Sequence, residues 1–197
     1  MKLFAFTDTH GNKKIILSLI KKIKISSPDV VICSGDLTNF SIGLQKFLMM
    51  FKKTNLPLLI IPGNHETNSD LEKACKKTGF AVNIHKKIYS INNYFFFGFG
   101  LGGFAEKNSE LEKLIPKIKK AAEGKILITV THQPPHKTKL DYLNSGYSGS
   151  KSIRNLIKEV KPKLNICGHL HENENKIDKI NSTIIINPGH KGRIIKI

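Results

Sequence analysis

The sequence is poor in cysteine, in long apolar runs and in acidic residues. Its three cysteines, Cys33, Cys75 and Cys167, are odd in number and have no paired spacing, which is typical of a protein of the reducing cytoplasm. The first residues lead directly to Asp8 rather than into the hydrophobic region of a signal peptide. The longest apolar stretch, 94–104, is far shorter than the ~20 residues of a membrane helix and is interrupted by glycines. We therefore expect a cytoplasmic protein with no membrane-spanning segment.

Acidic residues number only 15 against 32 lysines and arginines, which gives a formal net charge of +17. Such a charge attracts polyanions and phosphorylated molecules. Many of the lysines lie in stretches of helical period, such as Lys13, Lys14, Lys21 and Lys22, where charge normally faces solvent. No basic run is interleaved with aromatic residues on which single-stranded nucleic acid would stack. The charge leaves nucleic acid open as a partner, and it identifies neither the substrate nor the oligomeric state.

The 197 residues, of which 40% are hydrophobic and 24% charged, have the size and composition of one globular domain, which we expect to span 1–197. Short apolar runs alternate with longer stretches of helical period, which is the pattern of a layered α/β domain. The expected strands are 2–7, 30–34, 57–61, 82–84, 87–91, 94–98, 126–131, 164–167, 176–180, 183–187 and 193–197. Helices are expected between them, and the segments 82–98 should form a meander or hairpin.

Helix ends are predicted from capping residues. Asn12 is suited to cap a helix that runs to about residue 26, and further helices are expected over 43–53 and 152–160. Two pairs have the spacing of capping boxes: Ser69 with Glu72, before a helix that ends at Gly79, and Ser109 with Glu112. Pro116 should lie in the first turns of its helix or kink it. The polar segment 140–151 is the longest irregular one and a candidate substrate loop.

The residues best suited to chemistry each stand immediately after an expected strand. They are Asp8-x-His10, Gly35-Asp36, Gly63-Asn64-His65-Glu66, Thr131-His132 and Gly168-His169-x-His171. In open α/β sheets, the loops at the carboxyl ends of the strands converge on one crevice, so we expect these five segments to meet. Gly35, Gly63 and Gly168 each precede a candidate ligand, where the missing Cβ lets the chain turn sharply and pass close to the site.

The types of these side chains indicate which metals would bind. Carboxylate, amide oxygen and imidazole without thiolate suit manganese, iron, zinc, cobalt or nickel better than copper(I) or a sulfur cluster, and calcium would need more oxygens. Seven ligands are too many for one such ion but fit two that share a carboxylate, the arrangement used for in-line phosphoryl displacement. The seven are Asp8, His10, Asp36, Asn64, His132, His169 and His171. We expect two divalent transition-metal ions, with manganese the first choice for an assay.

The order of these segments resembles the signature of the calcineurin-like metallophosphoesterase superfamily, which reads Asp-x-His, Gly-Asp, Gly-Asn-His-Asp/Glu, a lone His, and Gly-His-x-His. The resemblance extends from Asp8 to His171, and segments 131–135 and 187–189 look like those of small, single-domain prokaryotic members. It implies a four-layer αββα sandwich with the metal centre at the carboxyl ends of the strands. Glu66 departs mildly from the pattern, because this position is often Asp in the family.

The resemblance also implies a role for each residue. Asp8, His10 and His171 would hold the first metal; Asn64, His132 and His169 would hold the second. Asp36 would bridge the two ions, and a hydroxide shared between them would be the nucleophile. His65 matches the family's catalytic histidine, which binds no metal and donates a proton to the leaving oxygen or stabilises charge on it.

Several other polar residues have simpler explanations. Asn12, Asn39 and His136 are weaker candidates for substrate contact, since a helix cap, a turn residue and a solvated loop residue respectively explain them as well. His190 is also explained as a loop residue. His85 has no companion acid at useful spacing and is expected to be structural. Cys33 and Cys167 are expected in the core.

Three functions stay open on the sequence. The first is a metal-dependent phosphoesterase that acts on a small phosphate ester, with diesters favoured over monoesters. The second is a nuclease, which the charge of +17 and the kinship of this fold with DNA-repair nucleases suggest. The third is a binding scaffold like the retromer subunit that keeps this fold. Such relatives tend to lose the catalytic histidine or a ligand, and here none is lost.

Overall fold

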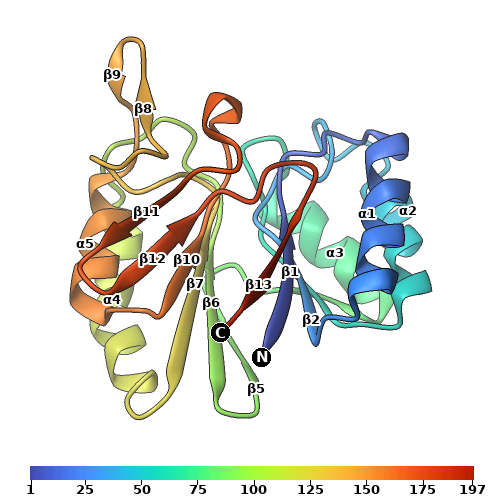
Figure 1. Cartoon of the computed structure of the whole chain (residues 1–197), viewed down its shortest axis with the longest axis horizontal. Helices are drawn as coiled ribbons and strands as arrows, with labels where there is room; N and C mark the ends of the chain where they lie inside the picture. The colour runs from blue at the N-terminus through green and yellow to red at the C-terminus, as the bar shows by residue number, and fades with distance from the viewer.

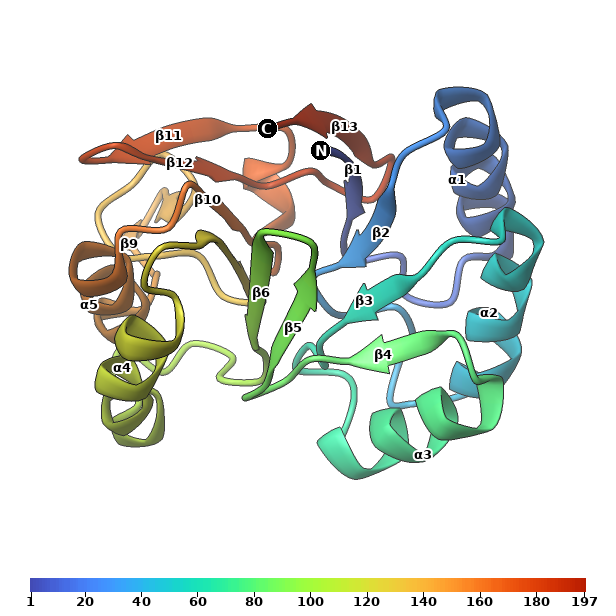
Figure 2. The same ribbon diagram turned by 90° about the horizontal axis from the view of Figure 1, so that it is seen from below.

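Two β-sheets lie face to face at the centre of the computed structural model, which describes residues 1–197 (Figures 1 and 2). Helices α1 to α3 cover the outer face of one sheet, and α4 and α5 cover the outer face of the other, as the view from below shows. This arrangement confirms the four-layer αββα sandwich that the resemblance implied. None of the five α-helices has the length and apolarity needed to cross a lipid bilayer.

The first sheet has the strand order β13-β1-β2-β3-β4. Its strands are β1 (Lys2–Phe6), β2 (Val30–Cys33), β3 (Leu58–Ile60), β4 (Ala81–Asn83) and β13 (Arg193–Lys196). The first four run parallel, and β13 pairs antiparallel with β1. The crossover helices are α1 (Lys13–Ser26), α2 (Leu44–Phe51), which continues into a 3₁₀ turn at Lys52–Thr54, and α3 (Asn68–Thr78).

The second sheet has the strand order β11-β12-β10-β7-β6-β5. Its strands are β5 (Ile88–Ile91), β6 (Tyr94–Phe99), β7 (Ile126–Thr131), β10 (Leu164–Ile166), β11 (Ile177–Ile180) and β12 (Thr183–Ile186). The central pairs β6–β7–β10–β12 are parallel, and hairpins add β5 and β11 at the edges. The helices on this sheet are α4 (Ser109–Ala121) and α5 (Lys151–Val160); a 3₁₀ turn, His171–Asn173, precedes β11.

Alternating residues of the strands fill three apolar layers. In β1, Phe4 and Phe6 pack toward α1 and α2, while Leu3 and Ala5 pack into the layer between the sheets. The third layer lies between the second sheet and its two helices. Because both faces of each sheet are covered, the central strands are apolar throughout rather than at every second residue. This burial on both faces explains why the strands could be predicted from continuous apolar runs in the sequence.

The structure corrects two predicted capping boxes. Helix α3 begins at Asn68, because Thr67 already accepts a hydrogen bond from the Asp70 backbone N–H at 3.0 Å. Glu72, which was expected to close the box with Ser69, instead accepts hydrogen bonds from the Lys87 ammonium and from Asn83.

Asn108 caps α4 in the same way, and so Ser109 is its first residue. Glu112, the other half of the second expected box, accepts a hydrogen bond from the Ser152 hydroxyl of α5. Pro116 lies inside α4, as the eighth residue of the helix. Gly79 ends α3 in a left-handed conformation with φ 74°, as predicted.

Two segments of the middle of the chain differ from expectation. The strand predicted at 82–84 does not join a meander with its successors: β4 pairs parallel with β3 in the first sheet, and only β5 and β6 form a hairpin. The segment 140–151 is not wholly irregular, because it carries a short hairpin of β8 (Tyr142–Leu143) and β9 (Gly146–Tyr147) that projects above the second sheet (Figure 1). Periodicity could not assign strands to sheets, and two-residue strands are too short to show a period.

Candidate metal centre

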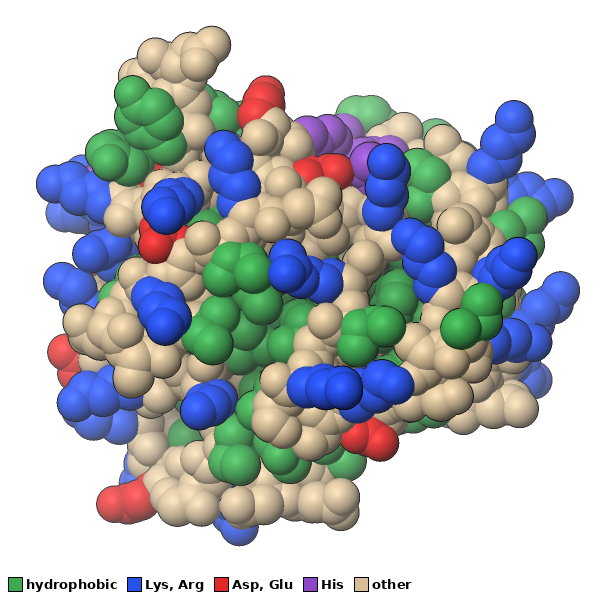
Figure 3. Space-filling model, viewed as in Figure 1, with side chains coloured by type: hydrophobic (Ala, Val, Ile, Leu, Met, Phe, Trp, Pro, Cys, Tyr) green, Lys and Arg blue, Asp and Glu red, His purple; other side chains and the backbone are tan.

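The carboxyl ends of five parallel strands bring the candidate ligands to one edge of the molecule. Asp8 and His10 follow β1, Asp36 follows β2, Asn64 and His65 follow β3, His132 follows β7, and His169 and His171 follow β10. The first three strands belong to one sheet and the last two to the other. The side chains therefore meet across the seam between the sheets, at the upper edge where Figure 3 shows histidines at the surface.

One group of ligand atoms comes from Asp8, His10 and His171, and these atoms all lie within 4.8 Å of one another. The Nε2 atoms of His10 and His171 are 3.2 Å apart, and His171 Nε2 is 3.9 Å from Asp8 Oδ1. The side chain of His171 is 54% exposed, whereas that of Asp8 is 1% exposed. Solvent therefore reaches this group from the side of His171.

A second group surrounds the amide oxygen of Asn64. Asn64 Oδ1 is 2.9 Å from both His132 Nε2 and His169 Nδ1. The imidazole of His132 is fully buried, and its Nδ1 lies 2.9 Å from the backbone oxygen of Ser34. That carbonyl can only accept, so Nδ1 carries the proton and Nε2 faces the oxygens of the site.

Asp36 lies between the two groups. Its Oδ2 is 3.4 Å from His132 Nε2 and 4.0 Å from His10 Nε2. Its other oxygen, Oδ1, accepts a hydrogen bond of 2.9 Å from the backbone N–H of His65. One carboxylate thus contacts both groups and also fixes the loop that carries His65. The His65 ring stands edge-on to the His10 ring, with 4.9 Å between their centroids.

Buried hydrogen bonds hold the ligand loops in place from behind. Glu66 Oε2 accepts from the backbone N–H groups of Asp36 and Gly63 at 3.0 and 2.9 Å, and Oε1 accepts from the backbone N–H and hydroxyl of Thr38 at 2.8 and 3.1 Å. The carboxylate of Glu66 therefore ties the loop after β2 to the loop after β3. The extra methylene relative to Asp leaves this carboxylate within hydrogen-bond reach of both loops.

The backbone at the site adopts conformations that side chains rarely allow. Asp8, His10, Asp36 and His169 all have left-handed φ angles, between 48° and 71°. Such residues persist only where their surroundings hold them, and they concentrate at functional sites. The glycines before the ligands leave room for this packing: a Cβ on Gly63 would overlap the Asp36 carboxylate, and one on Gly168 would overlap Thr7.

The electrostatics of the site favour positive charge. Burial alone would lower the pKa of His132, but the carboxylates of Asp36 and Asp8 outweigh it and raise the pKa to about 9. Burial also raises the pKa of Asp8, while for Asp36 the contact with His132 overcomes burial and lowers the pKa. Burial and the charge of His132 lower the pKa of His169 to about 4. A cation placed here would be stabilised by two buried carboxylates.

A family model described as calcineurin-like phosphoesterase matches residues 1–173 of the chain. The chain belongs to this family. A protein of Methanocaldococcus jannaschii, described as uncharacterized, is 30% identical, and the alignment covers 99% of this chain and 91% of that protein. A probable cyclic nucleotide phosphodiesterase of Vesicomyosocius okutanii is 33% identical over 84% of this chain and 70% of that protein. A crystal structure from Thermus thermophilus superposes with a TM-score of 0.77 at 16% identity, covering 96% and 90% of the two chains, which shows the same fold.

Calcineurin-like phosphoesterases normally use a dinuclear metal centre, and the side chains of this chain fit one. Asp8 Oδ1 and His169 Nε2 are buried and have no hydrogen-bond partner. His10 Nδ1 is 2.8 Å from Asn39 Oδ1, an acceptor, so the neutral ring turns the lone pair of Nε2 toward His171 Nε2. His132 likewise directs Nε2 toward two oxygens, an arrangement that a proton on Nε2 satisfies, as the raised pKa of His132 reflects, and that a cation would satisfy in its place. Lone pairs that face one another in this way are stabilised by cations between them.

The weaker substrate candidates lie outside these two groups. Asn12 accepts hydrogen bonds from the backbone N–H groups of Lys14 and Ile15 and so caps α1, as predicted. Both polar groups of Asn39 contact His10, one at its ring and one at its backbone oxygen. His136 lies against Asp141 and against Tyr147 of β9, and His190 Nδ1 lies 2.7 Å from Glu174.

The expected structural residues are buried as predicted. The ring of His85 accepts a hydrogen bond of 2.9 Å from the Gly100 backbone N–H, and burial lowers its pKa to about 4. Cys33 and Cys167 are completely buried, which raises the pKa of both thiols well above the ordinary value. These thiols face the core and take no part in the two groups of ligand atoms.

Sequence reasoning missed three supporting features. Asp141 is fully buried and accepts hydrogen bonds from three backbone N–H groups of the 137–149 loop, yet it occurs in a polar segment where nothing distinguishes it. The Ser34 carbonyl that orients His132 is a backbone group, and no residue type signals it. Phe40 and Phe104, which contact histidines of the site, lie in loops without period or motif.

Proposed function

We propose that the chain is a metal-dependent phosphodiesterase that hydrolyses a small phosphate diester. The observation that carries the proposal is the position of Asp36, whose Oδ2 lies 3.4 Å from His132 Nε2 and 4.0 Å from His10 Nε2. A carboxylate that contacts both histidine groups is what a two-ion centre requires. Two relatives with phosphodiesterase in their names, from Vesicomyosocius okutanii and Arcobacter nitrofigilis, support diesters over monoesters.

Each group of side chains would hold one divalent ion. Asp8, His10 and His171 would hold the first; Asn64, His132 and His169 the second; and Asp36 would be shared. Manganese, iron, zinc, cobalt and nickel all suit this set of oxygen and imidazole ligands. When bound, such ions would supply positive charge that polarises a phosphate and lowers the pKa of a bound water molecule. Asn39 and the Ser34 carbonyl would orient the rings of His10 and His132, because each accepts the Nδ1 proton.

His65 would serve the leaving group. Its backbone N–H is fixed on Asp36 Oδ1, its ring stands beside that of His10, and one of its ring nitrogens lies within 4.8 Å of ligand atoms of His10 and Asp36. Imidazole is the side chain that most often donates a proton to a leaving oxygen in enzymes. His65 therefore stabilises the charge that develops on the departing oxygen.

The test is hydrolysis with added Mn²⁺ of bis(p-nitrophenyl) phosphate, which establishes turnover, and of a dialkyl phosphate diester, whose leaving alkoxide needs a proton. Replacement of His65 by Ala should lower kcat for the dialkyl ester by roughly 10²- to 10⁴-fold, the usual effect of losing a general acid, while elemental analysis shows metal content unchanged. His190→Ala is the matched control, because His190 is a part-exposed histidine that pairs with Glu174. Equal rates for wild type and His65→Ala would refute the role of His65, and no turnover with any of the five metals would refute the function.

A nuclease is the second candidate, and the charge of +17 favours it. On the face seen in Figure 3 the lysines are spread widely rather than gathered beside the histidines, so this face shows no basic track toward the site. Incubation with single- and double-stranded oligonucleotides separates the two candidates. Intact oligonucleotides together with cleaved small diesters would exclude the nuclease.

A further inference from the structure

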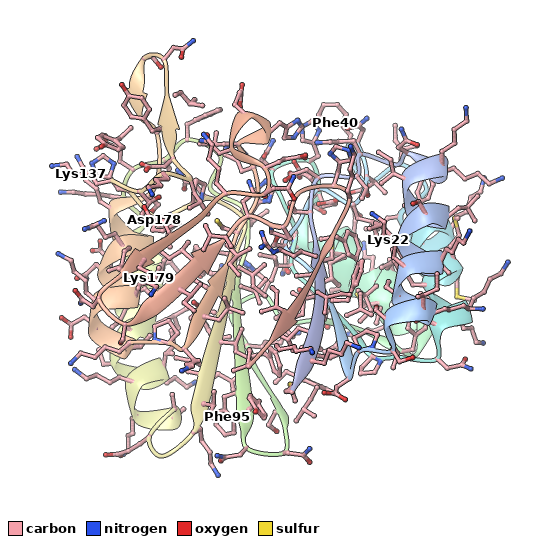
Figure 4. The ribbon with its side chains drawn as sticks, viewed as in Figure 1. Lys22, Phe40, Phe95, Lys137, Asp178 and Lys179 are labelled. Carbon is pink, nitrogen blue, oxygen red and sulfur yellow. The ribbon has the colours of Figure 1, made fainter.

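Two phenylalanines stand exposed beside two different histidines of the site. Phe40 has its ring centroid 4.9 Å from that of His65, and Phe104 has its centroid 4.7 Å from that of His169. The two residues are 74% and 66% exposed. Phe40 lies at the upper edge of the molecule, the edge to which the strands bring the ligands (Figure 4). An exposed phenylalanine ring forgoes roughly 1.5–3 kcal/mol of apolar burial, so a pair at one site calls for an explanation.

The chain holds both rings beside the site by bonding their loops to the loop after β3. The backbone N–H of Ser41, next to Phe40, donates to the His65 carbonyl at 3.1 Å. The backbone N–H of Leu101, at the start of the Phe104 loop, donates to the Pro62 carbonyl at 3.0 Å. Phe40 itself has a left-handed φ of 50°, which is rare for a bulky residue and is kept only where the surroundings impose it.

The rings belong to different halves of the site. Phe40 contacts His65, whose other ring neighbour is His10. Phe104 contacts His169, whose other ring neighbour is His132. A phosphate diester held by ions that share Asp36 would have two organic arms, one that leaves and one that stays on phosphorus. With His65 in its proposed role, the arm that leaves would lie beside His65, and the arm that stays would lie on the side of His169.

We infer that Phe40 and Phe104 are specificity-determining residues that stack on planar groups of a diester, Phe40 on the leaving arm and Phe104 on the retained arm. The inference rests on the proposed phosphodiesterase function and names its substrate class: diesters whose arms carry aromatic rings, such as a nucleobase. Stacking on an aromatic side chain is tolerant of the ring's identity, because every base has a π-face. Aliphatic arms gain less from these two rings.

The experiment compares two diesters with the same leaving group. Thymidine 5′-(p-nitrophenyl phosphate) and ethyl p-nitrophenyl phosphate both release p-nitrophenolate, so their ratio of kcat/KM reports only the retained arm. Wild type should prefer the thymidine ester. Phe104→Ala should lower this ratio about tenfold, the factor that ~1.4 kcal/mol of stacking gives. Phe40→Ala should lower kcat/KM for both esters by one common factor and leave their ratio unchanged.

Three controls keep the outcome unambiguous. Phe104→Trp should restore the ratio, because it keeps a stacking face. Ile25→Ala removes a large side chain that is 76% exposed at the last turn of α1, at the opposite edge of the molecule, and should change neither substrate. Melting temperature and metal content establish that each variant is folded and loaded.

The outcomes separate the inference from the function on which it rests. If wild type hydrolyses both esters and Phe104→Ala keeps the wild-type ratio, the inference is wrong and the phosphodiesterase function stands. A ratio that changes in Phe40→Ala overturns the assignment of the arms. If neither ester is hydrolysed, the proposed function fails, and calorimetric titration of the Mn²⁺-loaded protein with thymidine 5′-monophosphate still tests the ring. Binding at least about tenfold weaker in Phe104→Ala than in wild type supports the inference, whereas equal binding by the two proteins, or no detectable binding by wild type, overturns it.

Discussion

Replacement of Glu66 by Gln should destabilise the protein although it changes only one atom of the side chain. Glu66 is 4% exposed, and each of its two oxygens accepts two hydrogen bonds. Gln converts one oxygen to an NH₂ group, which faces N–H donors. The lower-cost orientation points the NH₂ toward Thr38, whose hydroxyl can rotate to accept, so that the Thr38 backbone N–H alone is left without a partner.

The expected cost is about 2–3 kcal/mol. A buried donor without a partner costs roughly 1–3 kcal/mol, and the remaining bonds lose the strength that the charge gave them. For a chain of this length, that loss corresponds to a fall in Tm of roughly 4–12 °C. The cost exceeds anything expected of a surface glutamate, because water cannot replace the lost acceptor.

Urea unfolding in the presence of a chelator measures this effect without a contribution from bound metal. Glu159→Gln is the matched control: Glu159 is 50% exposed, pairs with Lys119 at 3.3 Å on the surface, and should change stability by less than about 1 kcal/mol. Surface substitutions usually change the free energy of unfolding by up to ~0.5 kcal/mol. If Glu66→Gln also stays within ~0.5 kcal/mol of wild type, Glu66 does not hold the two loops together as described.

Three other outcomes are expected. His85 has a pKa of about 4 in the folded protein against 6.5 in the unfolded chain, so its contribution to the free energy of unfolding is fully present above pH 6.5. That free energy should fall by about 3 kcal/mol as the pH drops to 4. In a His85→Gln variant, the free energy of unfolding should fall by less between the same two pH values. Gly63→Ala should lose bound metal in elemental analysis, because its Cβ would overlap the Asp36 carboxylate, whereas Gly124→Ala, with nothing within 4 Å, should keep it. Chelation should abolish diester hydrolysis and lower Tm, with both restored by Mn²⁺; an unchanged Tm would contradict binding to the folded state.

The sequence was most informative where chemistry follows a strand. Apolar runs mark the strands, and the polar residue after each run marks the carboxyl end, so the site residues could be named from the sequence. The contact of Asp36 with His132 joins two different sheets, which periodicity does not distinguish. Helix caps were less certain: Thr67 precedes Ser69 by two residues, and both have an acid three positions later. The backbone conformation of the folded protein decides which of these two residues caps the helix.

Contacts through backbone groups and exposed rings could not be predicted. The carbonyl of Ser34 orients His132, and any residue type would supply the same oxygen. Asn39 was read as a turn residue or a substrate contact, because nothing in its spacing places it beside the ring of His10. Phe40 and Phe104 belong to loops whose conformation depends on bonds to Pro62 and His65, which lie far away in the sequence.

The seam between the sheets has a mechanical consequence. Asn64 reaches from the first sheet to His132 and His169 of the second, so the spacing of these donors is set by how the two sheets are stacked. The stacking is fixed by the apolar layer between the sheets, which includes Ile32 and Leu59 of the first sheet and Ile128 and Ile166 of the second. Ions bound between the sheets would cross-link the two halves of the domain. Removal of a buried methyl group from this apolar layer would then weaken the binding of the ions without changing any ligand atom.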